Sequence, residues 1–375
     1  MNSRERLFAV LDGRPVDRVP IWLLFPYHKV GYYADVRENP CYRDIFEHSK
    51  ARALMLDRRH LGAPLFEPSV VSREEKTTGP GGVVVRRTLT WNGRTAYSET
   101  REQPDGGRSV KHLLDNEDDL CTVAEFPILT DKKAITAALD QHLPAYQREK
   151  AEFPAEYGAM MLDLGEPIGA VYGSANLLEY PIWSITQAET VRGYLDRLLE
   201  RLRIIYRYAL EHDLADVYFL VGSELASPPM VSRATFQSWI VPYARELIDL
   251  IHSYGRKVIQ HYHGQIKEVL PDFLTMAPDG LHTIEAPPTG NCTLAEAFGT
   301  TGNRITLIGN IQYDCFRSYT EDEMRQAVKA VIDEANGRRF ILSPSAGPYE
   351  PTISDRVRAN YVAFLNAGWE HGGAA

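Results

Sequence analysis

The feature that most constrains the fold of this chain is an alternation, from about residue 155 onward, of short apolar runs with longer helical patterns. Such an alternation is typical of repeated βα units around a parallel sheet. The apolar runs predict strands over six segments: Ala159–Leu164, Val217–Val221, Lys257–His261, Gly280–Glu285, Ile305–Gly309 and Arg339–Ser343. A further strand, Val19–Leu24, is expected near the N-terminus, after a helix that ends at Asp12 and Gly13.

Between the strands, three segments have the period of amphipathic helices. Apolar residues recur at spacings of three to five from Val191 to Leu210, which is close to the helical period. A second helix is expected over 234–254 and ends at Gly255, and a third begins at the cap residue Thr320. These helices are long enough to form the outer ring of a barrel.

The chain length favours one barrel with an insertion. The chain has 375 residues, and α/β barrels use about 250 residues or more as one domain. The region 64–118 breaks the βα rhythm with two β-rich runs that flank Asn92-Gly93, the strongest short hairpin signal. We therefore expect a single domain over 1–375, a (β/α)8 TIM barrel with an antiparallel β-hairpin insertion at about 64–118. Two unrelated domains are the alternative, and the insertion either caps the active site or is purely structural.

Charge and hydropathy exclude several classes of binding partner for this chain. The formal net charge of -9 and the absence of a Lys/Arg-rich run argue against nucleic acid and anionic membranes. No run approaches the ~18 apolar residues of a membrane span, and the opening MNSRERLFAVLDGRP is charged and amphipathic, unlike a signal peptide. The cysteines are scattered and form no CxxC pair: Cys41, Cys121, Cys292 and Cys315. We expect a cytoplasmic enzyme that acts on a small molecule.

Polar residues follow several of the predicted strands. In a barrel, the carboxyl ends of the strands converge on one mouth, where catalytic groups gather. The residues collected by this rule are Asp163, Glu166, Glu224, His261, His263, Glu285, Asn310, Gln312 and Ser343. Glu224 and Asp163 are candidate catalytic carboxylates if burial raises their pKa. A salt bridge is the alternative role for each.

His261 and His263 are the sharpest feature of this set. Because they stand two residues apart on an extended strand, both imidazoles lie on the same face. With Glu285 they make a set of two histidines and one carboxylate, which is able to hold a catalytic zinc ion with one position open. The alternative is that the histidines only hydrogen-bond substrate or a neighbouring carboxylate. His282 is an odd count from Glu285 and is expected to face the helices.

Several common catalytic and nucleotide-binding motifs are absent from the sequence. The pattern has no GxGxxG after a strand, no P-loop and no GxSxG elbow, which removes the main support for dinucleotide, nucleoside-triphosphate and serine-hydrolase functions.

Other residues are candidates for the wall of a substrate pocket. For the aromatic residues among them, core packing is the alternative role. The candidate substrate-binding residues are Trp22, Tyr27, Tyr172, Tyr262, Asn310, Gln312 and Tyr349.

Four segments together carry a resemblance to a known family. The opening RERLFAVLDGRPVDRVPIW resembles the start of the uroporphyrinogen decarboxylase superfamily. The resemblance continues in SRATFQSWIVPYARELIDLIHSYGRKVIQHYHGQIKEVLPDF, ITLIGNI and FILSPSAGP, so it covers nearly the whole chain. It implies a (β/α)8 barrel with a pocket at the carboxyl ends of the strands, and a homodimer is the common state of such barrels.

The resemblance is closer to one branch of that superfamily than to the other. True uroporphyrinogen decarboxylases need no cofactor and carry an RQAGRY-like segment, which here reads LLFPYHKVGYY, and a late histidine whose place is taken by Ala346. The zinc methyltransferases carry an HxC motif, which here reads His261-Tyr262-His263, and a later cysteine, again replaced by Ala346. Zinc bound without thiolates is harder, which favours activation of an oxygen- or nitrogen-linked methyl group, or of water.

Three functions follow as hypotheses. The first is a metal-assisted methyltransferase or demethylase that moves a methyl group between a small methylated substrate and a corrinoid protein, with Glu224 as the acid. Its cofactors are zinc and a corrinoid carried on a separate partner protein. The alternative is a cofactor-free carboxy-lyase in which His261 helps to stabilise a carbanion. A second alternative is a non-catalytic barrel that only binds its ligand.

Overall fold

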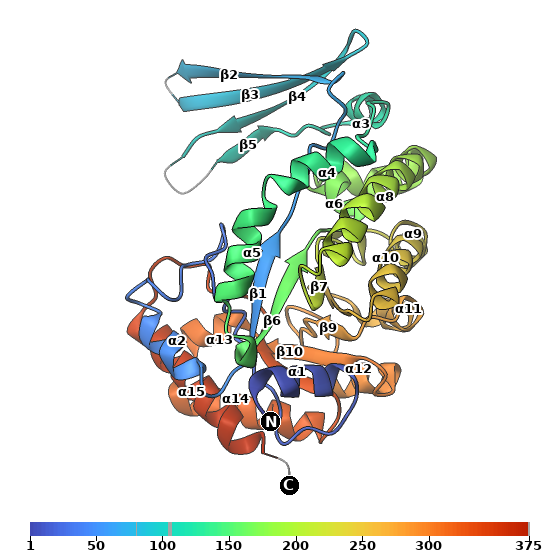
Figure 1. Cartoon of the computed structure of the whole chain (residues 1–375). Coiled ribbons are helices and arrows are strands. Elements are labelled where there is room, and N and C mark those ends of the chain that lie inside the picture. The colour runs from blue at the N-terminus through green and yellow to red at the C-terminus, as the bar shows by residue number, and fades with distance from the viewer. Residues whose placement is uncertain (80, 104–106, 374–375) are drawn as a thin grey trace.

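The centre of the protein is a curled, all-parallel sheet of seven strands in the order β1-β6-β7-β8-β9-β10-β11. The computed structural model describes residues 1–79, 81–103 and 107–373 (Figure 1). The strands are β1 (Met55–His60), β6 (Gly158–Asp163), β7 (Val217–Leu220), β8 (Lys257–His261), β9 (Gly280–His282), β10 (Thr306–Ile311) and β11 (Phe340–Pro344). Six of them confirm strands expected from the sequence, and β1 is an addition.

A short extended segment lies between the two edges of this sheet. Ile21 forms a parallel bridge with Leu342 of β11, and Trp22 forms one with Leu54, just before β1. The strand expected over Val19–Leu24 is thus reduced to two bridged residues. Two features of the segment explain the reduction: Pro20 has no N–H to donate, and Leu24 has a φ of 61°, outside the β region.

Helices cover the outer face of the sheet (Figure 1). The helices before β7 are α1 (Ser3–Leu11), α2 (Arg43–Ser49), α3 (Glu117–Ala124), α4 (Lys132–Asp140), α5 (Leu143–Glu152), α6 (Pro167–Tyr172), α7 (Tyr180–Thr186) and α8 (Ala188–Glu211). Those after β7 are α9 (Arg233–Trp239), α10 (Val241–Ser253), α11 (Leu270–Met276), α12 (Leu294–Thr301), α13 (Tyr313–Ser318), α14 (Glu321–Ala335) and α15 (Asp355–His371). Among the described residues, no helix is both long and apolar enough to cross a membrane.

The long helices agree with the sequence except at one proline. α8 confirms the helix expected from Val191 onward, and Thr320 caps α14 as predicted. The single helix expected over 234–254 is split into α9 and α10, because Pro242 has no amide hydrogen and its ring would collide with the carbonyl group four residues earlier. Gly255 follows α10 with a φ of 70°, as expected for a glycine that ends a helix.

Apolar side chains of α1 fill the N-terminal end of the curled sheet. Leu7, Val10 and Leu11 are buried in one cluster with inward-facing strand residues such as Ile259 and Ile308. In Figure 1, α1 lies at the lower end of the sheet, and the arrows of β1 and β6 point away from it. The opposite end, where the strands terminate, is therefore the end at which a site has room to form.

A separate antiparallel sheet of four strands lies beyond the carboxyl ends of β1 and β6 (Figure 1). Its strands are β2 (Val71–Gly79), β3 (Gly82–Trp91), β4 (Arg94–Arg101) and β5 (Arg108–Lys111). Asn92 and Gly93 form the turn between β3 and β4, both with positive φ, which confirms the predicted hairpin. An ion pair between Lys111 and Asp119, 2.6 Å apart, attaches the sheet to α3.

Candidate active site

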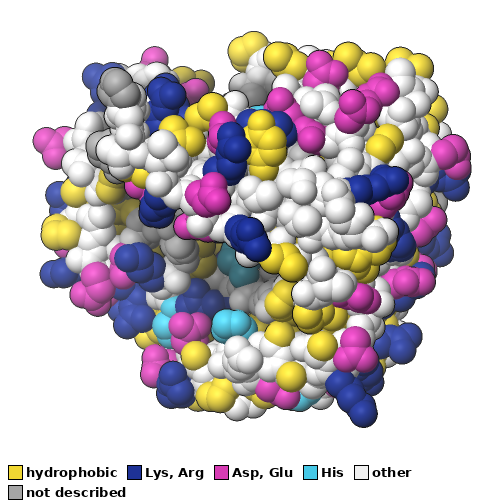
Figure 2. Space-filling model, turned by 90° about the horizontal axis from the view of Figure 1, so that it is seen from above, with side chains coloured by type: hydrophobic (Ala, Val, Ile, Leu, Met, Phe, Trp, Pro, Cys, Tyr) yellow, Lys and Arg dark blue, Asp and Glu magenta, His cyan; other side chains and the backbone are white. Residues whose placement is uncertain are grey.

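A cavity of about 130 Å³ lies at the carboxyl ends of the parallel strands. Seen from above, this face of the molecule is hollowed, and histidine side chains lie in and beside the hollow (Figure 2). The lining residues come from the first loops, five strands and the loop after β11: Trp22, Leu24, Tyr33, Leu56, Arg58, Met161, Phe219, His261, His263, His282, Ser345, Ala346, Gly347 and Tyr349. The predicted site residues Trp22, His261, His263 and Tyr349 are thus brought together.

Strand alternation decides which residues face this cavity. Ile259 belongs to the inner apolar cluster, so His261 and His263, two and four residues later, face the same side. Tyr262 faces the opposite way and is fully buried against Phe236 and Phe273. The fixed period of a strand therefore places one predicted substrate contact, Tyr262, in the helical layer.

His261 and His282, of which His282 is fully buried, form a pair of imidazoles at the ends of neighbouring strands. They stand opposite each other in the register of β8 and β9, and their Nδ1 atoms lie 2.7 Å apart. The Nε2 atom of His282 donates a hydrogen bond to the carbonyl oxygen of Pro344 at 3.1 Å. Burial holds the pKa of His261 well below its ordinary value and lowers the pKa of His282 to about 3, so both rings are neutral at pH 7.

His263 forms an ion pair with Glu285 on the same wall. Nδ1 of His263 lies 3.2 Å from Oε1 of Glu285, and the other carboxylate oxygen accepts a hydrogen bond from the Gly264 amide at 2.6 Å. Burial alone would lower the pKa of His263, but the hydrogen bond and negative charge of Glu285 outweigh it and raise this pKa. The same pair keeps the pKa of Glu285 low despite its burial. Unlike His261, His263 is therefore stabilised as an imidazolium.

Arg58 brings a fixed positive charge to the cavity. It projects from β1, its guanidinium hydrogen-bonds Asp163 at the end of β6, and it lies 5.0 Å above the centre of the Phe219 ring. Burial disfavours the charged guanidinium, but the negative charge of Asp163 outweighs it and raises the pKa of Arg58. Asp163, a predicted catalytic residue, thus contacts the cavity only through Arg58.

Three glutamates singled out in the sequence lie at different places around the cavity. Glu285 lies behind His263, whereas Glu224 accepts a hydrogen bond from the Gly222 amide at 3.0 Å and is outside the lining. The negative charge of Glu224 still helps to raise the pKa of His263. Glu166 is fully buried, accepts a hydrogen bond from Ser223 at 2.6 Å, and burial raises its pKa to about 8.

The remaining predicted contacts lie around the cavity rather than on its wall. Tyr27 packs against Phe153 and the guanidinium of Arg37, on the side of α5. Tyr172 lies on α6, next to Tyr180. Gln312 accepts a hydrogen bond from Ser345, at 3.2 Å, so it supports the loop that forms part of the wall. Asn310 is buried at the end of β10.

Sequence reasoning missed Arg58, His282 and Tyr33. Arg58 was missed because β1 reads MLDRRH, in which charged residues hide the apolar alternation. His282 was expected to face the helices, which is wrong: β9 ends at His282, so strand alternation does not extend to Glu285. Tyr33 reaches the wall because residue 347 is glycine; a Cβ there would lie 2.6 Å from the Tyr33 ring.

A zinc ion held by His261, His263 and Glu285 would need three free donor atoms that face one point. His261 keeps Nε2 as a free donor atom, but Nδ1 of His263 and one oxygen of Glu285 are paired with each other, and the other oxygen of Glu285 accepts from the Gly264 amide. Ala346 on the wall offers no donor. Over the residues that the structure describes, no three His, Cys, Asp or Glu side chains are grouped to hold a metal. The side chains in this arrangement therefore do not fit zinc with three protein ligands.

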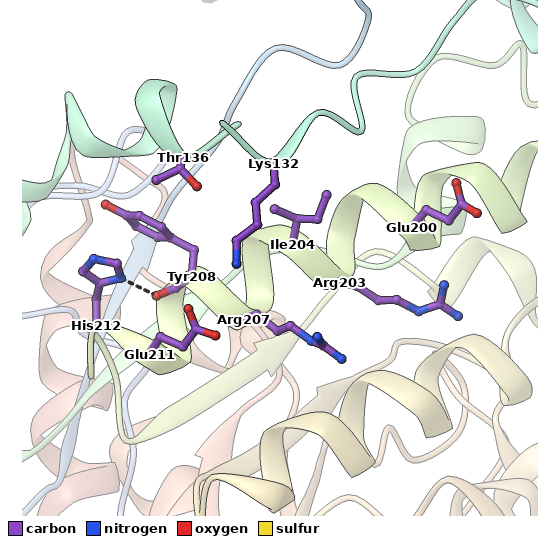
Figure 3. A pocket seen from close by; sticks show the side chains of 9 residues that line it. All are labelled: Lys132, Thr136, Glu200, Arg203, Ile204, Arg207, Tyr208, Glu211 and His212. Atoms are coloured by element: carbon purple, nitrogen blue, oxygen red, sulfur yellow. Dashed lines mark hydrogen bonds between the residues drawn. The ribbon is translucent and has the colours of Figure 1, made fainter. Parts of the chain in front are cut away.

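A second cavity, of about 370 Å³, lies between α4 and α8 in the outer layer (Figure 3). Basic and acidic side chains are mixed along it, and Arg203 is committed to an ion pair with Glu246 of α10. His212 Nδ1 donates to the Tyr208 carbonyl oxygen at 2.8 Å. None of the site residues predicted from the sequence is among its lining residues, so we place the chemistry at the strand ends.

Comparison with known proteins identifies the family of this chain. A sequence model described as uroporphyrinogen decarboxylase (URO-D) matches residues 170–362, the part of the chain that carries His261, His263, His282 and Ala346. Among solved structures, a methyltransferase from Methanosarcina mazei superposes with a TM-score of 0.60 at 17% identity and covers 99% of both chains, a likeness of fold. A comparison with curated proteins gave no match. Because the matched segment is more than half of the chain, this protein belongs to the uroporphyrinogen decarboxylase family.

Proposed function

We propose that this protein is a methyltransferase or demethylase that moves a methyl group between a small methylated substrate and a corrinoid protein. The observation that carries the proposal is that one cavity is lined by two histidines in opposite settings: burial lowers the pKa of His261, whereas the Glu285 carboxylate, 3.2 Å from His263, raises the pKa of His263. The proposal includes a complete (β/α)8 barrel, in which the bridged residues Ile21 and Trp22 take the place of one strand.

The size and walls of the cavity suit a small substrate. A volume of about 130 Å³ limits the cavity to a small molecule. Trp22, Met161 and Phe219 give it an apolar floor that accepts a methyl group, while His263 and Arg58 supply positive charge at the wall. This combination favours a small molecule that carries a methyl group next to a polar or anionic group.

His263 is the residue that we assign as general acid. Methyl transfer breaks the bond between the methyl carbon and a heteroatom, and the heteroatom keeps the electron pair. A proton from His263 neutralises that pair as it forms, and Glu285 stabilises the imidazolium before transfer. Glu224, the acid expected from the sequence, lies outside the lining. In this proposal, Glu224 acts on His263 only through its charge.

The acceptor comes from outside the chain in this proposal. A corrinoid on a separate partner protein would supply a cobalt nucleophile for the methyl carbon. The residues of this chain then orient the substrate and supply the proton at His263. Zinc bound by His261, His263 and Glu285, the ligand set expected from the sequence, is not part of the proposal, and no step depends on it.

A second candidate function is favoured by Arg58. A guanidinium on the wall of a small cavity is able to bind a substrate carboxylate, and His263 is placed to protonate the carbanion left after loss of carbon dioxide. This is the cofactor-free carboxy-lyase expected as the alternative. The two functions share the acid and differ in the bond that breaks.

One set of assays separates the two functions. Untagged protein is incubated with small methylated amines, ethers and thioethers together with free cob(I)alamin, and methylation of cobalt is followed by absorption. Parallel incubations with small carboxylates measure release of carbon dioxide. Methylation of cobalt that is lost in His263→Asn but kept in His371→Asn, an exposed histidine in the last turn of α15, supports the proposal. Carbon dioxide release without methylation contradicts it, and activity in neither assay favours a non-catalytic binding protein.

A further inference from the structure

His282 is held by a hydrogen bond at each of its ring nitrogens. It is fully buried, its Nε2 lies 3.1 Å from the Pro344 carbonyl oxygen, and its Nδ1 lies 2.7 Å from Nδ1 of His261. The rings of His261 and His282 are nearly parallel, with centroids 4.8 Å apart and an angle of 21° between their planes. The roles assigned above to His263, Glu285 and Arg58 make no use of this arrangement.

The Pro344 carbonyl determines where His282 carries its proton. A carbonyl oxygen only accepts, so Nε2 of His282 must donate. The two polar contacts of this buried ring are a carbonyl group and another imidazole, and neither provides the negative charge that would stabilise an imidazolium. His282 is therefore neutral, and its Nδ1 carries a lone pair.

The state of His282 in turn determines the state of His261. His282 Nδ1 has no proton to give, so the hydrogen bond between the two Nδ1 atoms must be donated by His261. A neutral imidazole carries only one N–H. Nε2 of His261 thus keeps its lone pair, and it is the nitrogen that remains for a ligand in the cavity that His261 lines.

We propose that His282 is a positioning residue that holds His261 in the Nδ1-protonated tautomer, so that His261 Nε2 acts as an acceptor in the cavity. The tautomer stands on the two hydrogen bonds and on the neutral state of His261, whose ring lies against Phe219 and the His263 ring. What the acceptor does for the reaction rests on the proposed function.

Under that function, the proposal narrows the substrate class. The rings of His261 and His263 lie 4.6 Å apart and are perpendicular, and they have opposite roles: His261 accepts and His263 donates. A substrate that satisfies both carries an N–H or O–H group close to the heteroatom that bears the methyl group. We therefore expect methylated amines or ethers with a neighbouring hydrogen-bond donor to react faster than analogues without that donor.

The test reads the tautomer directly. Protein labelled with ¹⁵N-histidine gives two-dimensional spectra in which protonated ring nitrogens are distinguished from those with a lone pair, and His261→Gln identifies the signals of His261. In the wild-type protein at pH 7 we expect a protonated Nδ1 and an unprotonated Nε2. His282→Leu removes the acceptor, so the Nε2-protonated form of His261 should appear. His282→Asn places an amide oxygen near the former Nδ1 position, so it should retain the wild-type tautomer.

The outcomes are separable from those of the activity assays. A wild-type His261 that is protonated at Nε2, or a His282→Leu variant with an unchanged tautomer, overturns the proposal. If His282→Leu does not fold, as judged by circular dichroism, the wild-type spectrum alone decides. Methyl transfer should be lost in His282→Leu and partly restored in His282→Asn. If the spectra show the expected tautomer but the protein transfers no methyl group, the proposed function is wrong and the positioning role of His282 still holds.

Discussion

Glu285 approaches Nδ1 of His263 at 3.2 Å from one side of the ring, and His261 lies against the same ring with its centroid 4.6 Å away. The carboxylate is 3% exposed, so little solvent screens its charge. A carboxylate therefore raises the pKa of one histidine of the HxH motif, while burial lowers the pKa of the other. Identical residue types two positions apart thus have pKa values shifted in opposite directions.

We predict that Glu285→Gln lowers the reaction rate and shifts its pH profile. The pKa of His263 is raised by Glu285, so the protonated acid is present at low pH and is lost as pH rises through that pKa. Without the carboxylate, burial lowers the pKa and the descending limb of kcat moves to lower pH. At pH 7 we expect a drop in kcat of about a hundred-fold, the lower end of general acid catalysis. An unshifted limb would remove His263 from the role of acid.

The free energy of unfolding should fall in acid because of His282. Its folded-state pKa is lowered to about 3 by burial, against an unfolded value of about 6.5. The unfolded chain therefore binds the extra proton first, and stability is lost as pH falls from about 6.5 towards 3, by at most about 1.4 kcal/mol per pH unit from this group. Urea unfolding at pH 7.0 and pH 5.0 should show a smaller loss in His282→Asn than in the wild type, and equal losses would contradict this assignment.

Breaking the pair of Arg58 and Asp163 should cost stability. The side chains are 13% and 10% exposed, so Arg58→Met leaves a buried carboxylate without its partner. Such a change costs about 3 kcal/mol in the free energy of unfolding. The matched control is Arg358→Met, which breaks a surface pair with Asp44 and should cost at most about 1 kcal/mol. Guanidinium unfolding measures both, and similar losses in the two variants would contradict the prediction.

Zinc content should depend on His263 and Ala346, which stand where the zinc methyltransferases carry cysteines. The wild-type cavity offers imidazoles but no third free donor, so we expect zinc well below one ion per chain in untagged protein by elemental mass spectrometry. His263→Cys/Ala346→Cys supplies two thiolates beside His261 and should raise the content towards one. One zinc per wild-type chain that is lost in His261→Ala/His263→Ala would instead support the ligand set predicted from the sequence.

Most of the fold was predictable because it rests on local patterns. The parallel strands are apolar runs, and the β3–β4 turn needs the positive φ values that Asn92 and Gly93 accept. β1 escaped detection because its outward-facing Asp57 and Arg59 are charged. They are buried through tertiary partners, since Asp57 contacts His28 at 2.7 Å and Arg59 contacts Glu149 at 2.7 Å. Such ion pairs join residues far apart in the sequence, so no local pattern predicts them.

The site was predictable only in part, for a related reason. Strand alternation places His261 and His263 on the cavity wall from their spacing alone. The partners that set their protonation come from other strands: Glu285 follows β9, and His282 is fixed by the Pro344 carbonyl of β11. These contacts depend on the register of the sheet and the length of β9, which a single sequence does not specify.

The apolar side chains of α1 close the N-terminal end of the curled sheet, so the cavity is open only at the carboxyl ends of the strands. With Leu7, Val10 and Leu11 packed among the strand residues, the reacting groups are reached from the carboxyl ends of the strands. Under the proposed function, a small substrate and a much larger methyl carrier share that approach. The small molecule then has to enter before the carrier docks, and it leaves only after the carrier departs, so turnover would follow a compulsory order.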